Sequence, residues 1–381
     1  MDFDLSEEQN ILKDSIGRLL SDKYSFEKRR HYQQSAKGWS DALWSDYAGM
    51  GLLALPFAEE DGGLGGSDVD RMVVSEVLGK ALILEPYFAT VILGGSVLRH
   101  GGTPEQRARL VPQVAEGALK LAFACLEPQS RYDLGDVETR AEQAGDGWRV
   151  TGKKTVVIHG GSADRIFVTA RTGETADGKT PVGLFLVDAT AAGVAIDDYL
   201  THDGLRAADV TFDGVAVSAQ DVFGTPGEAL PLVQRVVDEA IAVLCAEALG
   251  AMTVMLDLTV DYLKVRNQFG GPIARFQALQ HRASEMYVAV EQARSMTLFA
   301  TAMLASPDDE ERSNAVRAAK FSIGREGRFV GESAIQLHGG IGMTMENAVG
   351  HYFKRMTMID LLFGDSDHHM AALADSNARF G

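Results

Sequence analysis

The stretch Ala240–Leu256, AIAVLCAEALGAMTVML, contains a single charged side chain, Glu247. An uninterrupted apolar run of this length predicts a helix that is buried on nearly every side. Burial disfavours the charged form of a carboxylate that has no cation beside it, so the pKa of Glu247 would rise and the group could take up a proton near neutral pH. Gly250 and Ala251 share its helix face and are small, which would leave room for a ligand. The alternative is that Glu247 pairs with an Arg from another helix.

The sequence on either side of this helix changes its character twice. From Ser6 to about residue 120, apolar residues recur with a helical period, and Ser6 with Gln9 forms a capping-box pattern. From about residue 119 to 225, short runs rich in Val, Ile, Phe and Thr alternate with turns, which predicts strands. The helical period returns from about residue 226. We predict an α+β fold with an N-terminal helical domain at 1–119, a middle β domain at 120–225 and a C-terminal helical domain at 226–381.

The composition limits the classes of partner. With 46% hydrophobic and 23% charged residues and no low-complexity tract, the chain has the composition of an ordered globular protein. A formal net charge of −17 disfavours nucleic acid as a partner, because binding to a phosphate backbone requires Lys and Arg. The N-terminal residues lack the basic and apolar regions of a signal peptide, and we expect no membrane span. Cys125 and Cys245 show no disulfide or metal-binding spacing, so we expect a cytoplasmic location.

Two sequence blocks carry a family resemblance. The first, Arg266–Ile273 (RNQFGGPI) followed by Phe276–His281 (FQALQH), closely resembles the signature that follows the long helix of acyl-CoA dehydrogenases. The second, Ala334–Gly342 (AIQLHGGIG), resembles the Q-x-x-G-G-x-G segment with which that family contacts the FAD of a neighbouring subunit. The resemblance covers nearly the whole chain. It implies an N-terminal helical domain, a middle β-barrel-like domain and a C-terminal four-helix bundle, with FAD at a subunit interface.

The resemblance also implies roles for particular residues. Arg266 would supply a cation to the pyrophosphate of FAD, Gln277 and Gln336 would offer amides, and glycines would let the backbone approach closely. The cofactor-binding residues that it implies are Leu126, Ile158, Arg266, Gln268, Phe269, Gln277, Gln336, Gly339, Gly340, Gly364 and Asp365. At Leu126 and Ile158 only backbone contacts would remain, because the side chains usual in the family are absent. Asp238 and Arg131 are the predicted substrate-binding residues.

The family's usual catalytic bases are missing. Many members have a Glu before the Gly of a C-terminal E-G-T segment, and here Phe363 stands at that position. A second family position, near the start of the long helix, is occupied by Ala240. Glu247 follows Ala240 by two helical turns on nearly the same face and is our candidate base.

This pattern affects the expected assembly. A Glu within the long helix, together with the C-terminal run Phe363–His369 (FGDSDHH), resembles the small subunit of heteromeric dehydrogenases that degrade steroid side chains or dicarboxylic acids. We therefore expect a homo-oligomer or a heterotetramer with a homologous large subunit. The same run has carboxylates and imidazoles, but adjacent His residues on a helix point about 100° apart, so no metal site is predicted.

The predicted reaction is removal of the α-proton of an acyl-CoA by Glu247 with hydride transfer from Cβ to FAD, giving a trans-2-enoyl-CoA. Electrons would pass to an electron-transfer flavoprotein, as the resemblance implies. One alternative is a structural subunit that supports an active homologue and has no complete site. Another is a flavin oxidase or oxygenase on the same fold, which would need access for oxygen.

Overall fold

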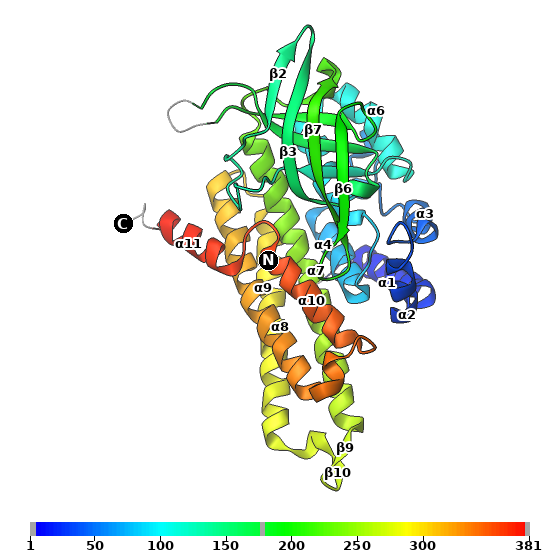
Figure 1. Cartoon of the computed structure of the whole chain (residues 1–381). Coiled ribbons are helices and arrows are strands. Elements are labelled where there is room, and N and C mark those ends of the chain that lie inside the picture. Colours follow the sequence, from blue (N-terminus) through cyan, green and yellow to red (C-terminus); the bar gives the residue numbers. More distant parts are fainter. Residues whose placement is uncertain (1–4, 176–179, 378–381) are drawn as a thin grey trace. The chain divides into compact units, whose positions relative to one another are not determined.

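The computed structural model describes residues 5–175 and 180–377, and its elements follow the order helix, sheet, helix (Figure 1). The α-helices are α1 (Glu7–Lys23), α2 (Phe26–Gln33), α3 (Asp41–Gly49), α4 (Asp68–Ala81), α5 (Gly95–Gly101), α6 (Pro104–Ala115), α7 (Leu230–Val265), α8 (Gln277–Met303), α9 (Asp309–His338), α10 (Ala348–Leu361) and α11 (Ser366–Asn377). The strands are β1 (Leu121–Ala124), β2 (Arg140–Ala144), β3 (Gly147–Ile158), β4 (Arg165–Arg171), β5 (Val182–Asp188), β6 (Val194–Leu200), β7 (Arg206–Val217), β8 (Val222–Phe223), β9 (Asn267–Gln268) and β10 (Gly271–Pro272). The predicted mixture of helical ends and a middle sheet is confirmed.

The chain forms two compact units. The first comprises Met1–His31, Asp68–Ile83 and Ile241–Gly381, and the second comprises Tyr32–Ser67 and Leu84–Ala240. Helix α7 begins in the second unit and continues in the first. The eight-stranded sheet belongs to the second unit, whereas the long helices α8, α9 and α10 belong to the first.

In the first unit, helices α4 and α7 cross at a pair of glycines. A Cβ atom at Gly79 would lie 2.1 Å from the carbonyl oxygen of Glu247, and one at Gly250 would lie 2.1 Å from the carbonyl oxygen of Glu76. The two backbones therefore touch without side chains between them. The space beside Gly250 is filled by α4, and Ala251 is fully buried. The expectation that these two residues leave room for a ligand is wrong, because a helix occupies that room.

The same unit ends in a hairpin. Figure 1 shows β9 and β10 at the end of the bundle formed by α7, α8, α9 and α10. Within the hairpin, Phe269 and Gly270 both have positive φ, at 54° and 85°, as a two-residue type I′ turn requires. At this end the ring of Tyr262 on α7 stacks on His338, the last residue of α9, with centroids 4.5 Å apart. The ends of α7 and α9 are therefore neighbours.

In the second unit, the strand order of the main sheet is β6-β7-β3-β2-β4-β5-β8, with β1 pairing in parallel to β4. Strands β3, β4 and β5 lie within the region of about 119 to 225 for which the sequence predicts strands. Their inward side chains form one buried cluster, which includes Val150 and Phe185. Strands β4 and β5 are buried on both faces, which explains why they appear in the sequence as continuous apolar and β-branched runs.

Helix α7 is also long and apolar enough to span a membrane. One window of it has a mean hydropathy of 1.9, but 78% of that window is buried inside the protein. A helix in the core of a protein meets the same criterion, so this feature does not indicate a membrane span.

Candidate cofactor and catalytic site

The candidate base Glu247 is held by an arginine. Arg355 on α10 donates from Nε to Oε1 at 2.6 Å and from Nη2 to Oε2 at 2.8 Å. The side chains are mostly buried, at 6% exposure for Arg355 and 13% for Glu247. This is the ion pair that the sequence left as the alternative, and the premise that Glu247 has no cation beside it is wrong. Its role as a base remains a prediction.

A second group of predicted residues lies at the hairpin end of the bundle. The side chains of Arg266, Gln268, Gln277 and Gln336 are exposed, and none of them makes a hydrogen bond or ion pair with the residues that the structure describes. The stacked pair Tyr262 and His338 brings the segments that carry them to the same end. Guanidinium and amide donors that are free of protein partners are suited to phosphate and ring-edge acceptors.

The backbone at this end is open. Gly339 has φ 65° and ψ −147°, a conformation almost confined to glycine. A Cβ atom at Gly339 or Gly340 would meet nothing within 4 Å. A flat ligand could therefore approach the main chain here, as the resemblance implies.

A third group lies in the loop between α10 and α11. Phe363 and Gly364 have positive φ, at 57° and 110°, and a Cβ atom at Gly364 would lie 2.5 Å from the ring of His369. Three carbonyl oxygens at this loop accept hydrogen bonds from the Nζ atom of Lys320 on α9, those of Asp360 (2.8 Å), Leu362 (2.9 Å) and Gly364 (2.5 Å). Hydrogen bonds from Lys320 therefore hold the loop that contains the predicted cofactor contacts Gly364 and Asp365.

His369 adds an unused acceptor to this loop. Its Nε2 atom lies 3.1 Å from the carbonyl oxygen of Phe363, which can only accept, so Nε2 carries the proton. Burial, followed by the charges of Lys320 and His368, lowers the pKa of His369 to about 3 and keeps the ring neutral. The buried Nδ1 atom has no hydrogen-bond partner among the described residues. A hydroxyl or N–H group of a ligand would satisfy it.

The residues of the second and third groups fit FAD, which presents phosphates, ring acceptors and hydroxyl donors. The two groups are nevertheless far apart. Lys320, beneath the loop, and His338, at the hairpin end, both lie on the continuous helix α9. At ~1.5 Å rise per residue they are separated by about 27 Å.

The remaining predicted residues belong to the second unit. Ile158 ends β3, where it pairs with Ala207, and the carbonyl oxygen of Leu126 accepts from the Thr155 amide at 2.9 Å. Arg131 is exposed with φ 47°, whereas Asp238 is only 2% exposed and accepts from Gln234 at 2.9 Å. The substrate-binding roles of Arg131 and Asp238 remain predictions.

The structure contains charged groups that the sequence did not single out. Glu239, 1% exposed, accepts from Ser96 at 3.0 Å, from Arg99 at 2.6 Å and from Arg235 at 3.3 Å, and lies 2.6 Å from His100 Nε2. These partners come from α5 and α7 in the second unit. The i, i+4 spacing of Arg235 and Glu239 could have predicted their ion pair from the sequence. No sequence pattern indicates the partners on α5.

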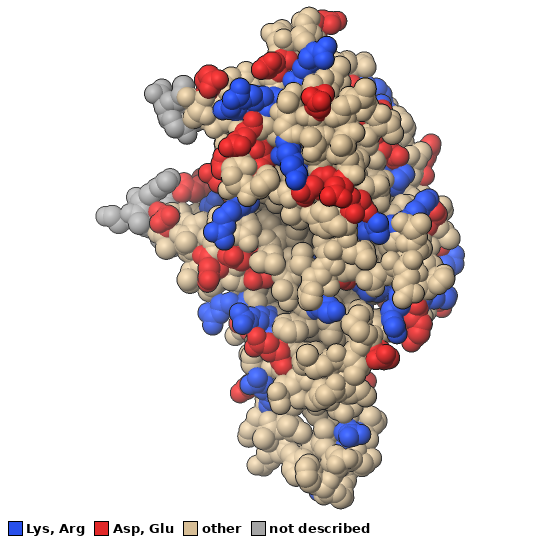
Figure 2. Space-filling model, viewed as in Figure 1, with Lys and Arg blue, Asp and Glu red and all other residues tan. Residues whose placement is uncertain are grey.

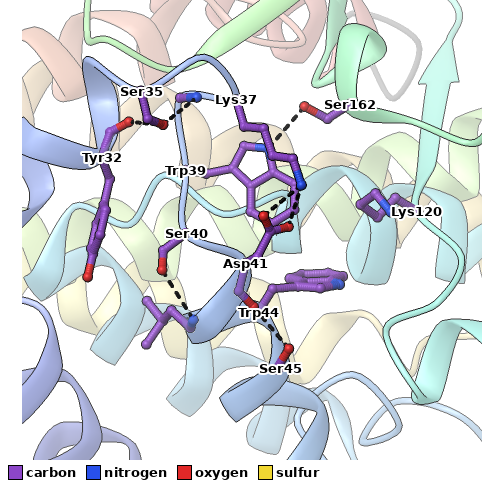
Figure 3. A network of polar contacts seen from close by, with 12 residues as sticks. Tyr32, Ser35, Lys37, Trp39, Ser40, Asp41, Trp44, Ser45, Lys120 and Ser162 are labelled. Carbon is purple, nitrogen blue, oxygen red and sulfur yellow. Dashed lines mark hydrogen bonds and ion pairs between the residues drawn. The ribbon is translucent and has the colours of Figure 1, made fainter.

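A network of polar contacts holds the segment from Tyr32 to Ser45 in the second unit (Figure 3). Trp39 is 5% exposed, and its indole N–H donates to Ser162 Oγ at 3.1 Å. Trp44 donates to the carbonyl oxygen of Gly117 at 2.9 Å. Ser162 follows β3, so Trp39 is tied to the corner just beyond the predicted cofactor contact Ile158.

In residues 5–175 and 180–377, no group of three or more His, Cys, Asp or Glu side chains is placed to hold a metal ion. In the C-terminal run, His369 is hydrogen-bonded to the carbonyl oxygen of Phe363. The rings of His368 and His369 meet edge to face, with centroids 5.2 Å apart.

The chain matches known proteins along most of its length. Family models for the N-terminal, middle and C-terminal domains of acyl-CoA dehydrogenase match residues 6–118, 122–215 and 230–377. Acyl-CoA dehydrogenase IpdE2 of Mycolicibacterium smegmatis is 30% identical over 354 residues, which is 92% of this chain and 93% of that protein. The probable acyl-CoA dehydrogenase YngJ of Bacillus subtilis is 28% identical over 98% of this chain and 99% of its own.

A solved structure agrees with the relatives. A variant of the Tcur3481-Tcur3483 steroid ACAD is 29% identical, covers 98% of both chains and superposes with a TM-score of 0.88. The chain belongs to the acyl-CoA dehydrogenase family. It is an oxidoreductase that acts on CH–CH bonds of acyl-CoA, and its cofactor is FAD.

Proposed function

We propose that the protein oxidises the Cα–Cβ bond of a bulky acyl-CoA thioester to a trans-2-enoyl-CoA and passes the electrons to an electron-transfer flavoprotein. The observation that carries the proposal is the set of free donors, Arg266, Gln277 and Gln336, beside the open glycines at the hairpin end. They supply what a pyrophosphate-containing cofactor needs. The chemistry that bound FAD supplies is acceptance of the hydride that leaves Cβ.

In this proposal Glu247 takes the α-proton. A proton passes from Cα to the carboxylate and a hydride leaves Cβ, so the substrate loses two hydrogens and gains one double bond. Arg355 keeps Glu247 in place, and each carboxylate oxygen keeps a second lone pair that can take the proton. Glu247→Gln should retain FAD and lose about 10²–10⁴-fold in kcat, the usual contribution of a general base. Unchanged turnover in that variant would show that the base lies elsewhere.

We further propose that two chains build each cofactor site. Because Lys320, beneath the loop with Gly364, and His338, next to Gly339, are about 27 Å apart along α9, one chain would contribute to two cofactors. The apolar side chains Val265, Phe269 and Met343, exposed by 71%, 82% and 75%, lie at the hairpin end and suit a second chain. Figure 2 shows few charged side chains at this end on the face in view. A homologous partner or a second copy would cover it.

The substrate class rests on a relative. The similarity to the Tcur3481-Tcur3483 steroid ACAD, at 29% identity, supports a steroid-derived acyl group and an unlike partner chain for this protein. Comparing the turnover of steroid-side-chain thioesters with that of straight-chain thioesters tests this choice.

We also propose a cytoplasmic location, because Cys125 and Cys245 are buried free thiols.

A structural subunit is the second candidate function. It is favoured by the engagement of both Glu247 oxygens with Arg355 and by Phe363 and Ala240 at the family's base positions. Purification alone and with a co-expressed homologue separates the two functions. A catalytic chain gives a yellow complex whose turnover depends on its own Glu247, whereas a structural chain gives turnover that Glu247→Gln leaves unchanged. Rapid reoxidation of the substrate-reduced protein by oxygen would instead indicate an oxidase.

A further inference from the structure

The loop Leu362–Asp365 has a conformation that its own sequence does not favour. Phe363 is in the left-handed region at φ 57°, where a residue with a side chain loses roughly 1–2 kcal/mol. It is also nearly buried, at 9% exposure, with Gly364 beside it at φ 110°. Such a backbone persists only where the surrounding structure fixes it.

Lys320 provides that fixation. Its side chain is 0% exposed, and the three hydrogens of its ammonium group have three acceptors, the carbonyl oxygens of Asp360, Leu362 and Gly364. His369 binds the intervening carbonyl of Phe363 at 3.1 Å. Consecutive carbonyls of the loop are therefore held by buried side chains from α9 and α11.

Helix packing brings Lys320 close to these carbonyls. One turn further along α9, a Cβ atom at Gly324 would lie 2.1 Å from both the Asp360 carboxylate and the Ser366 hydroxyl. These two groups are bonded to each other at 2.8 Å and connect the end of α10 to the start of α11. Glycine at this point lets α9 lie directly beneath the loop.

Lys320 is a lysine held in a buried site. Burial lowers the pKa of Lys320 to about 8, although Cys245, Asp360 and Asp365 act in the opposite direction. Burial of a cation costs free energy, whereas an apolar side chain of similar length would leave the carbonyl oxygens of Asp360, Leu362 and Gly364 without this donor. What the ammonium group gives in return is local: three hydrogen bonds that define one loop conformation.

We propose that Lys320 is a positioning residue for the cofactor site, holding the loop Leu362–Asp365 in the conformation in which Gly364 and Asp365 contact FAD. The inference rests on the proposed function, because those two contacts are part of it. Lys320 itself is covered by the loop and does not touch the ligand.

The test compares FAD affinity in variants of the full chain, purified with whatever partner accompanies it. Lys320→Met leaves three carbonyls without donors and should weaken FAD binding about tenfold or more, followed by quenching of flavin fluorescence. Lys320→Gln keeps two N–H donors and should lie between wild type and Lys320→Met, and it carries the test if the Met variant does not fold. Val330→Ala, at a fully buried position of the same helix, is the control for general destabilisation.

Hydrogen exchange gives a reading that does not need the cofactor. Amides of residues 362–369 should exchange faster in Lys320→Met than in Val330→Ala. If both Lys320 variants bind FAD as tightly as the Val330 control, the inference is wrong. If the wild-type protein binds no FAD, the proposed function is wrong instead. In that case, equal amide exchange at residues 362–369 in Lys320→Met and Val330→Ala would refute the role of Lys320 independently.

Discussion

Arg355 on α10 engages both carboxylate oxygens of Glu247 on α7, at 2.6 Å and 2.8 Å. A bidentate pair of this kind fixes the orientation of the carboxylate as well as its charge. This contact can have a catalytic role, if it orients Glu247 as a base, or a structural role, if it joins helices α7 and α10. Stability and turnover measurements respond differently to the two roles.

Removing Arg355 alone should be costly. Arg355→Met leaves Glu247 as a mostly buried charge without this partner and should lower the free energy of unfolding by about 3–5 kcal/mol. Replacing both, with Glu247→Leu and Arg355→Met, should recover most of that loss. Urea unfolding of the two single variants and the double variant gives the coupling. Additive losses would mean that the pair contributes nothing of its own.

The glycine crossing of α4 and α7 should not tolerate a methyl group. Gly250→Ala would place Cβ 2.1 Å from a carbonyl oxygen of α4, so the helices must separate and stability should fall by about 1–3 kcal/mol. Gly17→Ala on α1 is the matched control, since a Cβ atom there meets nothing within 4 Å. It should raise stability by about 0.5–1 kcal/mol. Equal effects of the two substitutions on the thermal midpoint would contradict the crossing.

Acid should weaken the second unit through Glu127. Burial alone would raise the pKa of Glu127, but the charge of Lys154 and hydrogen bonds from Lys154, Gln129 and Thr139 outweigh it and hold the pKa at about 2. A carboxylate whose pKa is depressed in the folded state stabilises above its unfolded value and loses that contribution as pH falls through the folded value. Stability should therefore decline between about pH 4.5 and pH 2. Glu127→Gln should flatten this part of the curve, and an unchanged slope would show that other carboxylates set it.

The indole of Trp39 should contribute through its single hydrogen bond. Trp39→Phe and Ser162→Ala should each cost about 1 kcal/mol or more, and the double variant should lose less than their sum (Figure 3). Lys264→Ala is the control, because its pair with Asp261 is 64% and 77% exposed and worth about 0.5 kcal/mol. Additivity of the Trp39 and Ser162 effects in denaturant unfolding would argue against the bond.

Local features of the fold could be predicted because they depend on neighbours in the sequence. The capping box at Ser6 and Gln9 forms as expected, with both hydrogen bonds present. The turn at Gly270 and the end of α9 at Gly339 require positive φ, which glycine signals directly. Strands such as β5 could be predicted from their apolar and β-branched residues.

The partners of buried charges could not be predicted. Glu247 and Arg355 are 108 positions apart, and nothing in either segment indicates the other. Lys320 was overlooked because a lysine in a helix is usually solvated, and its acceptors are backbone carbonyls that every sequence has. Small residues beside Glu247 were taken as space for a ligand, whereas Gly250 makes space for a helix. Composition shows where a side chain is small, but not what occupies the gap.

The length of α9 between Lys320 and His338 has a genetic consequence. If each cofactor takes the loop of one chain and the hairpin end of another, a chain damaged at Gly364 still offers an intact hairpin end, and a chain damaged at Arg266 still offers an intact loop. Two inactive variants mixed in one cell would then restore a fraction of working sites by intragenic complementation. Defects at the same end would never rescue each other.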